Sequence, residues 1–218
     1  MKNGQATVQE KTIVGKIATF LRHEITTTNY RAGAHLKESQ ISAEFGVSRV
    51  PVREAFRILQ SEGYLEVIPN RGSFVKPISL SYIKETSIVY KQLAPIILEK
   101  AIPNYRESTY KKAFNLLEKI EKSTDFTNVG YMLWDFARVI YGPSKYDFML
   151  CIFDDIYSHS IRLLSEFFKN AETKQYKVES HYEFLHLCKQ GKKDEAIKYW
   201  SDFIGNMSNI AVALAEKK

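Results

Sequence analysis

Ser48, Arg49 and Arg53 begin a segment in which polar and basic side chains lead into a run of regularly spaced apolar residues. An arginine guanidinium can bond O6 and N7 of guanine through its fork of N–H groups, or it can hold a phosphate. The chemistry that these residues indicate is therefore DNA recognition. Taken singly, Arg49, Arg53 and Arg57 could each simply solvate the outer face of a surface helix.

Two short helices are expected to position these side chains. The first covers residues 38–45 and is closed by Gly46, and the second covers residues 48–61, with Ser48 as its cap and Pro51 in its first turn. Two such helices joined at a glycine have the layout of a helix-turn-helix, whose second helix presents its N-terminal residues to the major groove. A longer amphipathic helix is expected before them, over residues 8–27.

A hairpin is expected after the second helix, with strands at 64–68 and 73–75 joined by the turn 69–72. It would form the wing of a winged helix-turn-helix, whose tip can approach the DNA backbone or the minor groove. Lys37 is expected to face a phosphate and Glu38 to cap its helix, although plain surface is an equal alternative for Lys37. The predicted DNA-binding residues are Lys37, Ser39, Ser48, Arg49, Val50, Arg53, Asn70, Arg71 and Gly72.

The sequence FGVSRVPVREAFRILQSEGYL at 45–65, followed by PNRGSFV at 69–75, closely resembles the GntR family of bacterial regulators. This resemblance implies that Arg49 and Arg53 are recognition-helix arginines and that Gly72 is the wing glycine. It also implies that Ser48 contacts the operator. Ser39 stands where some relatives carry an arginine, so one phosphate contact is expected to be missing.

After Pro77 the pattern is helical throughout. Pro95 is expected to kink or split the first helix. We therefore expect a mainly α protein, with a winged helix-turn-helix DNA-binding domain at 1–78 and an all-helical effector-binding and dimerisation domain at 79–218. The helical segments are expected at 81–104, 108–122, 128–141, 145–169, 174–190 and 193–216.

The helical part resembles the FCD effector-binding bundle of the FadR-type subfamily, which implies a homodimer that binds a small effector, often an organic acid. Many such bundles hold a divalent metal through an Asp-x-x-x-His pair and two later histidines. At those positions this chain has Leu133, Ala137, His181 and Phe203, so we expect no metal cofactor. The cavity should then take a more apolar ligand or be filled by its own side chains. The candidate effector-binding residues are Arg138, His159, Arg162 and His181, on helices expected to line the interior.

An alignment shifted by one helical turn is the alternative, in which Asp135, His159 and either His181 or His186 form a metal site. Cys151 and Cys188 both lie in apolar surroundings and are expected to be buried free thiols. No nucleophile–base motif, glycine-rich phosphate loop or paired-carboxylate arrangement is present in the sequence, so an enzyme is not expected.

The net charge is +6, and residues 1–78 hold eleven lysines and arginines against seven acidic residues. This balance permits a polyanionic partner without requiring one. No segment has the length of apolar sequence that a membrane span or a signal peptide needs, so a cytoplasmic protein is expected. The function predicted is a DNA-binding regulator, most often a repressor, with operator DNA, a second copy and a small effector as partners and no membrane contact. The alternative is a ligand-binding helical dimer with weak or vestigial DNA binding.

Overall fold

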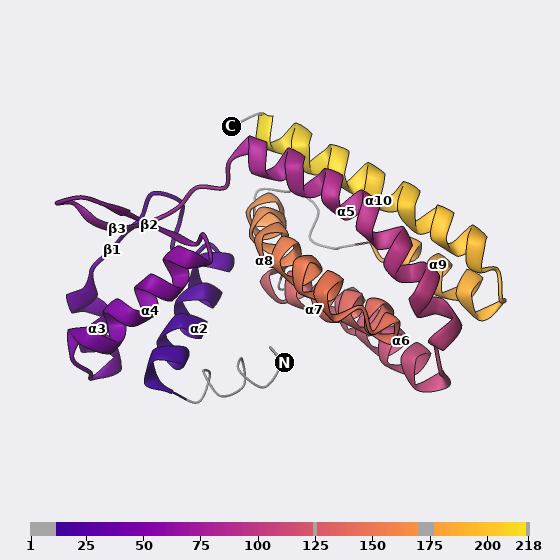
Figure 1. The fold of residues 1–218 in the computed structure, drawn as a ribbon, viewed down its shortest axis with the longest axis horizontal. Helices are drawn as coiled ribbons and strands as arrows, with labels where there is room; N and C mark the ends of the chain where they lie inside the picture. Colours follow the sequence, from indigo (N-terminus) through magenta and orange to yellow (C-terminus); the bar gives the residue numbers. More distant parts are fainter. Residues whose placement is uncertain (1–11, 124–125, 170–176, 217–218) are drawn as a thin grey trace. The chain divides into compact units, whose positions relative to one another are not determined.

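The computed structural model describes residues 12–123, 126–169 and 177–216, in which the side chains of 126–128, 159, 162–169, 211 and 214–215 are not described. The chain divides into two compact units, Met1–Ile78 and Ser79–Lys218. Figure 1 shows a small α-helical unit with a sheet, and an all-helical unit that contains the remaining helices.

Three helices form the core of the first unit: α2 (Ile13–Thr26), α3 (Glu38–Phe45) and α4 (Arg49–Ser61). Thr12 caps α2, because its Oγ1 accepts a hydrogen bond of 3.0 Å from the backbone N–H of Gly15. Gly46 ends α3 at a φ of 63°, a left-handed conformation that suits glycine. The expected start of the first helix at residues 8–11 lies outside the described residues. Buried side chains of α2 and α4 face one another, among them Ile17, Leu21, Val52, Phe56 and Leu59.

The sheet of this unit has three antiparallel strands in the order β1-β3-β2. They are β1 (His35–Leu36), β2 (Leu65–Ile68) and β3 (Gly72–Val75). The predicted hairpin is present as β2 and β3, whereas β1 was not predicted, because two residues are too few to show an alternating pattern. Phe74 of β3 lies opposite His35 of β1 on one side and opposite Glu66 of β2 on the other.

The second unit is helical in all its described residues. Its first helix, α5 (Leu80–Ala101), runs through Pro95 without being split, and α10 (Lys193–Glu216) packs along it (Figure 1). The expected mainly α fold is confirmed. No helix among the described residues is both long and apolar enough to cross a membrane. The other elements are η1 (Ile102–Asn104), α6 (Glu107–Lys122), α7 (Phe126–Tyr141), η2 (Gly142–Ser144), α8 (Asp147–Lys169) and α9 (Glu179–Lys189).

Aromatic side chains fill much of the described core of this unit. The hydroxyl of Tyr141, which is fully buried, accepts a hydrogen bond of 2.7 Å from Nε1 of Trp200, so the polar ends of both rings are satisfied. The hydroxyl of Tyr105 donates to the carbonyl of Ile140 at 2.6 Å. Cys188 is buried, and burial raises the pKa of its thiol to about 12. Cys151 is exposed, so the expectation that both thiols are buried is wrong for this residue, which lies on the outer side of α8.

Candidate nucleic-acid interface

The first turn of α4 presents Arg49 and Val50 to solvent. Val50 is 63% exposed, which is unusual for a large apolar side chain and suits contact with a thymine methyl group. Both residues precede the buried stripe that begins at Val52, so the surrounding core does not cover them. Ser48 has the extended backbone of an N-cap residue, but its side chain makes no capping hydrogen bond. The hydroxyl of Ser48 is therefore not used by the helix, and the prediction of a side-chain cap is wrong.

An ion pair holds the third predicted residue of this helix, Arg53, beside α3. The Nε of Arg53 donates to Oε1 of Glu38 at 3.1 Å and its Nη2 donates to Oε2 at 2.9 Å, which is a two-pronged geometry. This hydrogen bonding, together with the positive charges of Arg53 and Arg49, lowers the pKa of the Glu38 carboxyl. Arg53 is thus fixed in direction before any ligand arrives, with its remaining N–H groups exposed.

Glu38 does not cap α3 as the sequence suggested. It is the first residue of the helix, Lys37 occupies the N-cap position, and no side-chain cap hydrogen bond is formed there. The carboxylate instead joins the two helices of the helix-turn-helix. Sequence reasoning missed this pair because the two residues are fifteen positions apart, and no helical spacing connects them.

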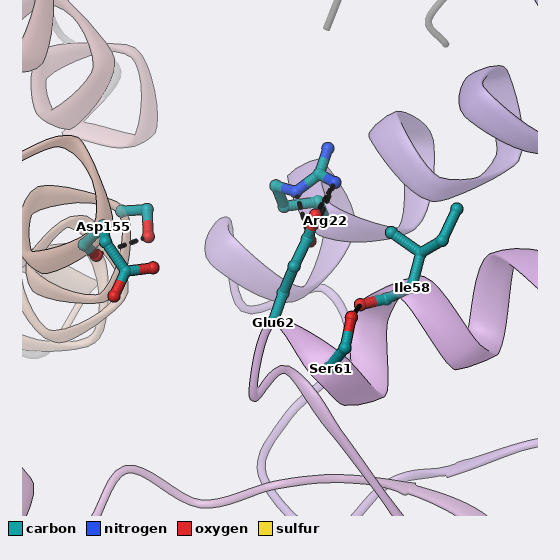
Figure 2. A network of polar contacts seen from close by, with 6 residues as sticks. Arg22, Ile58, Ser61, Glu62 and Asp155 are labelled. Atoms are coloured by element: carbon teal, nitrogen blue, oxygen red, sulfur yellow. Dashed lines mark hydrogen bonds and ion pairs between the residues drawn. The ribbon is translucent and has the colours of Figure 1, made fainter. Parts of the chain in front are cut away.

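A second two-pronged ion pair fixes the other end of α4. Arg22 of α2 donates from Nε to Glu62 at 3.0 Å and from Nη2 at 2.8 and 2.9 Å (Figure 2). Glu62 is the C-cap residue of α4, and in the same turn Ser61 Oγ donates to the carbonyl of Ile58 at 2.8 Å (Figure 2). The recognition helix, as we call α4, is therefore tied to a neighbouring helix at each end.

The wing brings Asn70, Arg71 and Gly72 to its exposed tip, as predicted. Asn70 and Gly72 have φ angles of 61° and 99°, and this left-handed backbone makes the turn tight. The guanidinium carbon of Arg71 lies 5.8 Å from the centre of the Phe74 ring, which directs the side chain along the wing.

A cavity of about 250 Å³ lies where the wing, the start of α3 and the start of α4 meet. It brings together four predicted residues, Lys37, Ser39, Arg49 and Gly72, from three different elements. Lys37 and Arg49 make no ion pair with any residue in the described ranges, so both charges are available to a ligand. The other predicted residues lie outside its lining, which consists of His35, Leu36, Lys37, Glu38, Ser39, Arg49, Gly72 and Ser73.

Arg138, predicted to bind an effector, lies on the surface of the second unit rather than in its interior. Its side chain is 50% exposed, and its Nε donates to Oδ1 of Asp154 at 2.9 Å. The guanidinium carbon lies 4.0 Å from the ring centre of Trp134, whose Nε1 donates to the same Asp154 oxygen at 2.6 Å. Arg138 faces outward because the neighbouring Ala137 occupies the buried face of α7.

His181 is buried, with 3% of its surface exposed. Its ring centre lies 5.1 Å from those of Phe136, Trp200 and Phe203, each in an edge-on arrangement. Burial lowers the pKa of its imidazole to about 3, so the ring is neutral at physiological pH. The side chains of His159 and Arg162, the other two candidates, lie outside the described residues.

The side chains at the other positions of the predicted empty metal site all belong to the core of the second unit. Leu133 and Ala137 are buried, and Phe203 lies against the His181 ring. In the shifted alternative, Asp135 lies 3.9 Å from Arg138, and His186 is an exposed residue next to Phe114, so these side chains have other neighbours. Across the described part of the chain, no three His, Cys, Asp or Glu side chains gather as a metal site would require.

Comparison with known proteins agrees with this geometry. Residues 14–75 match the gntR family of bacterial regulatory proteins. The HTH-type transcriptional repressor RspR of Escherichia coli (strain K12) is 33% identical over 93 residues, which are 43% of this chain and 41% of RspR. The gluconate operon transcriptional repressor of Bacillus subtilis (strain 168) is 32% identical over 111 residues, 51% of this chain and 45% of that protein. These matches span less than half of either relative.

Two solved structures are similar to the chain over most of its length. A transcriptional regulator GntR from Rhodococcus sp. RHA1 has a TM-score of 0.79 at 20% identity and covers 92% of this chain and 97% of its own. E. coli McbR/YncC has a TM-score of 0.77 at 19% identity and covers 95% and 99%. At such identities the likeness concerns the fold alone. It is thus residues 14–75, within the N-terminal unit, that match the gntR family of bacterial regulatory proteins.

Proposed function

We propose that this chain binds operator DNA as a homodimer and represses transcription under the control of a small effector. The observation that carries the proposal is the first turn of α4, where Arg49 and Val50 are exposed and Glu38 holds Arg53 beside them. Two relatives of the N-terminal unit are named repressors, which supports repression as the outcome of binding.

On DNA, the start of α4 enters the major groove, where Arg49 and Arg53 bond base edges or adjacent phosphates. The wing tip lies on the neighbouring minor groove, where Arg71 favours the negative potential of a narrow groove. Lys37 and the two serines Ser39 and Ser48 contact the backbone and set the register of the helix. The two domains then have different roles: the domain at 1–78 binds DNA, and the domain at 79–218 binds the effector and forms the dimer.

A second copy of the chain is the partner that the surface of the helical unit suits. Ile88 and Ile96 of α5 are 63% and 49% exposed, and Phe148 of α8 is 79% exposed. These two helices lie together, since the rings of Tyr90 and Phe153 are 4.9 Å apart. Pairing with a second copy would cover these apolar side chains, and two-fold dimers read operators as paired half-sites. Light scattering should give about twice the 25.2 kDa of one chain.

The effector site of this proposal works without a metal ion. The all-helical second unit is consistent with an FCD-type bundle, and apolar or aromatic side chains surround His181 in place of further ligands. A neutral, apolar environment favours a ligand with a large apolar part. Native mass spectrometry of freshly purified protein tests this point. A retained small molecule supports it, and a stoichiometric metal that is lost on His181→Ala contradicts it.

Gel-shift measurements with DNA from immediately upstream of the chain's own gene test the central proposal. Arg49→Ala and Arg53→Ala should each weaken binding about tenfold or more per half-site at fixed salt, because a base contact is lost. Arg57→Ala is the matched control, since this exposed residue lies two turns beyond the start of the same helix and should matter less. Wild-type affinity in both variants contradicts the assignment. A stable dimer with no sequence preference favours the alternative, a ligand-binding dimer with vestigial DNA binding.

A further inference from the structure

The cavity between the wing and the starts of α3 and α4 is lined in part by an imidazole ring to which the proposed function gives no role. The ring belongs to His35, from the two-residue strand β1. A role for His35 rests on the proposed DNA binding. It depends on which group of the DNA binds in the cavity. On a duplex, a protein that reaches into one groove with a helix and into the next with a wing is crossed by a sugar–phosphate backbone between them.

The His35 ring is held in a defined orientation although it is exposed. It stacks on the Phe74 ring with centres 4.7 Å apart and an angle of 18° between the planes. Its Nε2 edge lies over Gly72, because a Cβ atom built on that glycine would be only 2.7 Å from Nε2. Gly72 therefore does two things: it permits the left-handed turn of the wing, and it leaves room for the imidazole edge beside the cavity.

The charges around the cavity favour an anion. Lys37 and Arg49 line it and make no ion pair with any described residue, whereas the carboxylate of Glu38 is occupied by Arg53. The hydroxyls of Ser39 and Ser73 add donors at the rim.

The other charged groups near His35 lie on the sheet. Glu66 of β2 and His35 both pair with Phe74, from opposite sides of β3, so Glu66 shares the face of the sheet but is separated from His35 by that strand. Arg71 lies over the same Phe74 ring. Apart from Glu38, which is paired with Arg53, the other charged groups that line the cavity with His35 are cationic, and a phosphodiester is the anion that DNA presents there.

We propose that this cavity receives one phosphate of the operator backbone and that the His35 imidazole binds this phosphate in its protonated form. Histidine is the side chain that ordinarily gains a proton near neutral pH. A phosphate in the cavity favours the charged imidazole, because the two groups then carry opposite charges. DNA binding is then accompanied by proton uptake at His35, and the affinity increases as the pH falls.

The test compares DNA affinity at about pH 6 and about pH 8 at constant ionic strength, with fluorescence anisotropy on the upstream duplex of the gel-shift experiment. The full-length wild type should bind about fivefold more tightly per half-site at the lower pH, as one exposed ion pair allows. Its salt dependence should be steeper there by about one phosphate contact per half-site.

Three variants make the test specific to this residue. His35→Gln should bind like the wild type at the higher pH and lose the increase at the lower pH. His35→Arg, which keeps its charge at both pH values, should bind tightly at both. His23→Gln is the matched control, because His23 is exposed in the same unit but lies on α2, and this variant should keep the wild-type pH dependence. Circular dichroism verifies that each variant is folded.

The outcomes separate this inference from the proposed function. If Arg49→Ala weakens binding but His35→Gln keeps the full pH dependence, the phosphate site is wrong and DNA recognition by α4 stands. The phosphate site is equally wrong if His35→Arg binds no better than the wild type at the higher pH. If the wild type binds the duplex at neither pH, both the site and the proposed function are overturned.

Discussion

The two units of this chain use charged and ionisable side chains in opposite ways. In the N-terminal unit they lie at the surface and are fixed in direction, as in the pairs Arg53–Glu38 and Arg22–Glu62. In the C-terminal unit the most strongly perturbed histidine, His181, is buried among aromatic rings. The first arrangement prepares a surface for a polyanion, and the second obtains its stability from packing. Substitutions should therefore affect binding in one unit and stability in the other.

The largest effect on stability is expected from Trp200→Ala. Trp200 is 3% exposed, packs against Phe184 and Phe203 with ring centres 4.8 and 5.0 Å away, and donates to Tyr141. Its removal should cost about 3–5 kcal/mol, because it leaves a cavity and takes one hydrogen bond from the buried Tyr141 hydroxyl. Hydrogen exchange measured by mass spectrometry should show faster opening of residues 79–218.

Trp134→Ala is the matched control for this prediction, since the chain has two tryptophans and Trp134 is only half-buried beside Arg138. It should cost clearly less. Exchange in residues 12–78 should remain unchanged in both variants. Equal acceleration of hydrogen exchange in both units by Trp200→Ala would mean that the two units unfold together. The contrast between the N-terminal and the C-terminal unit would then not hold.

Sequence patterns predicted the N-terminal unit in more detail than the C-terminal site. The bounds of α3 and the hairpin follow from a glycine stop and from short apolar runs flanked by turn residues. The pair Glu38–Arg53 and the strand β1 did not follow, because both depend on contacts between distant segments. In the helical unit the sequence pattern did not show which candidate effector residues face the interior: Ala137 is buried, whereas Arg138, one position further along α7, faces the solvent.

A change of pH should have an intermediate effect on stability, because it changes the protonation of His181 in the unfolded chain. The pKa of His181 falls from an ordinary value of 6.5 to about 3 in the folded chain, so between these values the unfolded chain takes up a proton that the folded chain does not. The free energy of unfolding of the C-terminal unit should therefore decrease as the pH falls below about 6.5, by up to about 1.4 kcal/mol per pH unit. Urea unfolding at several pH values between about 7 and about 5 measures this slope.

His181→Leu should remove this part of the slope, because leucine fills a similar volume and does not titrate. His186→Gln is the control, since His186 is exposed on the same helix and its replacement should leave the slope intact. A wild-type slope equal to that of His181→Leu would mean that His181 is protonated in the folded chain. The description of the His181 ring as buried in apolar surroundings would then be wrong.

The smallest effect is expected where the N-terminal unit relies on a surface ion pair. Arg22 and Glu62 keep 28% and 36% of their side chains exposed, so water and salt screen the attraction between them. Arg22→Met should reduce stability by only about 0.5–1 kcal/mol, and this difference should shrink further at high salt. Arg31→Met, at an exposed arginine for which the described structure gives no ion pair, provides the baseline. Urea unfolding of the variants at low and high salt measures both quantities.

A loss of stability near that of Trp200→Ala, or one that salt does not change, would show that the ion pair between Arg22 and Glu62 acts as part of the core. Equal stability of Arg22→Met and Arg31→Met would instead mean that apolar packing alone holds the recognition helix, and that the pair serves only to orient its end.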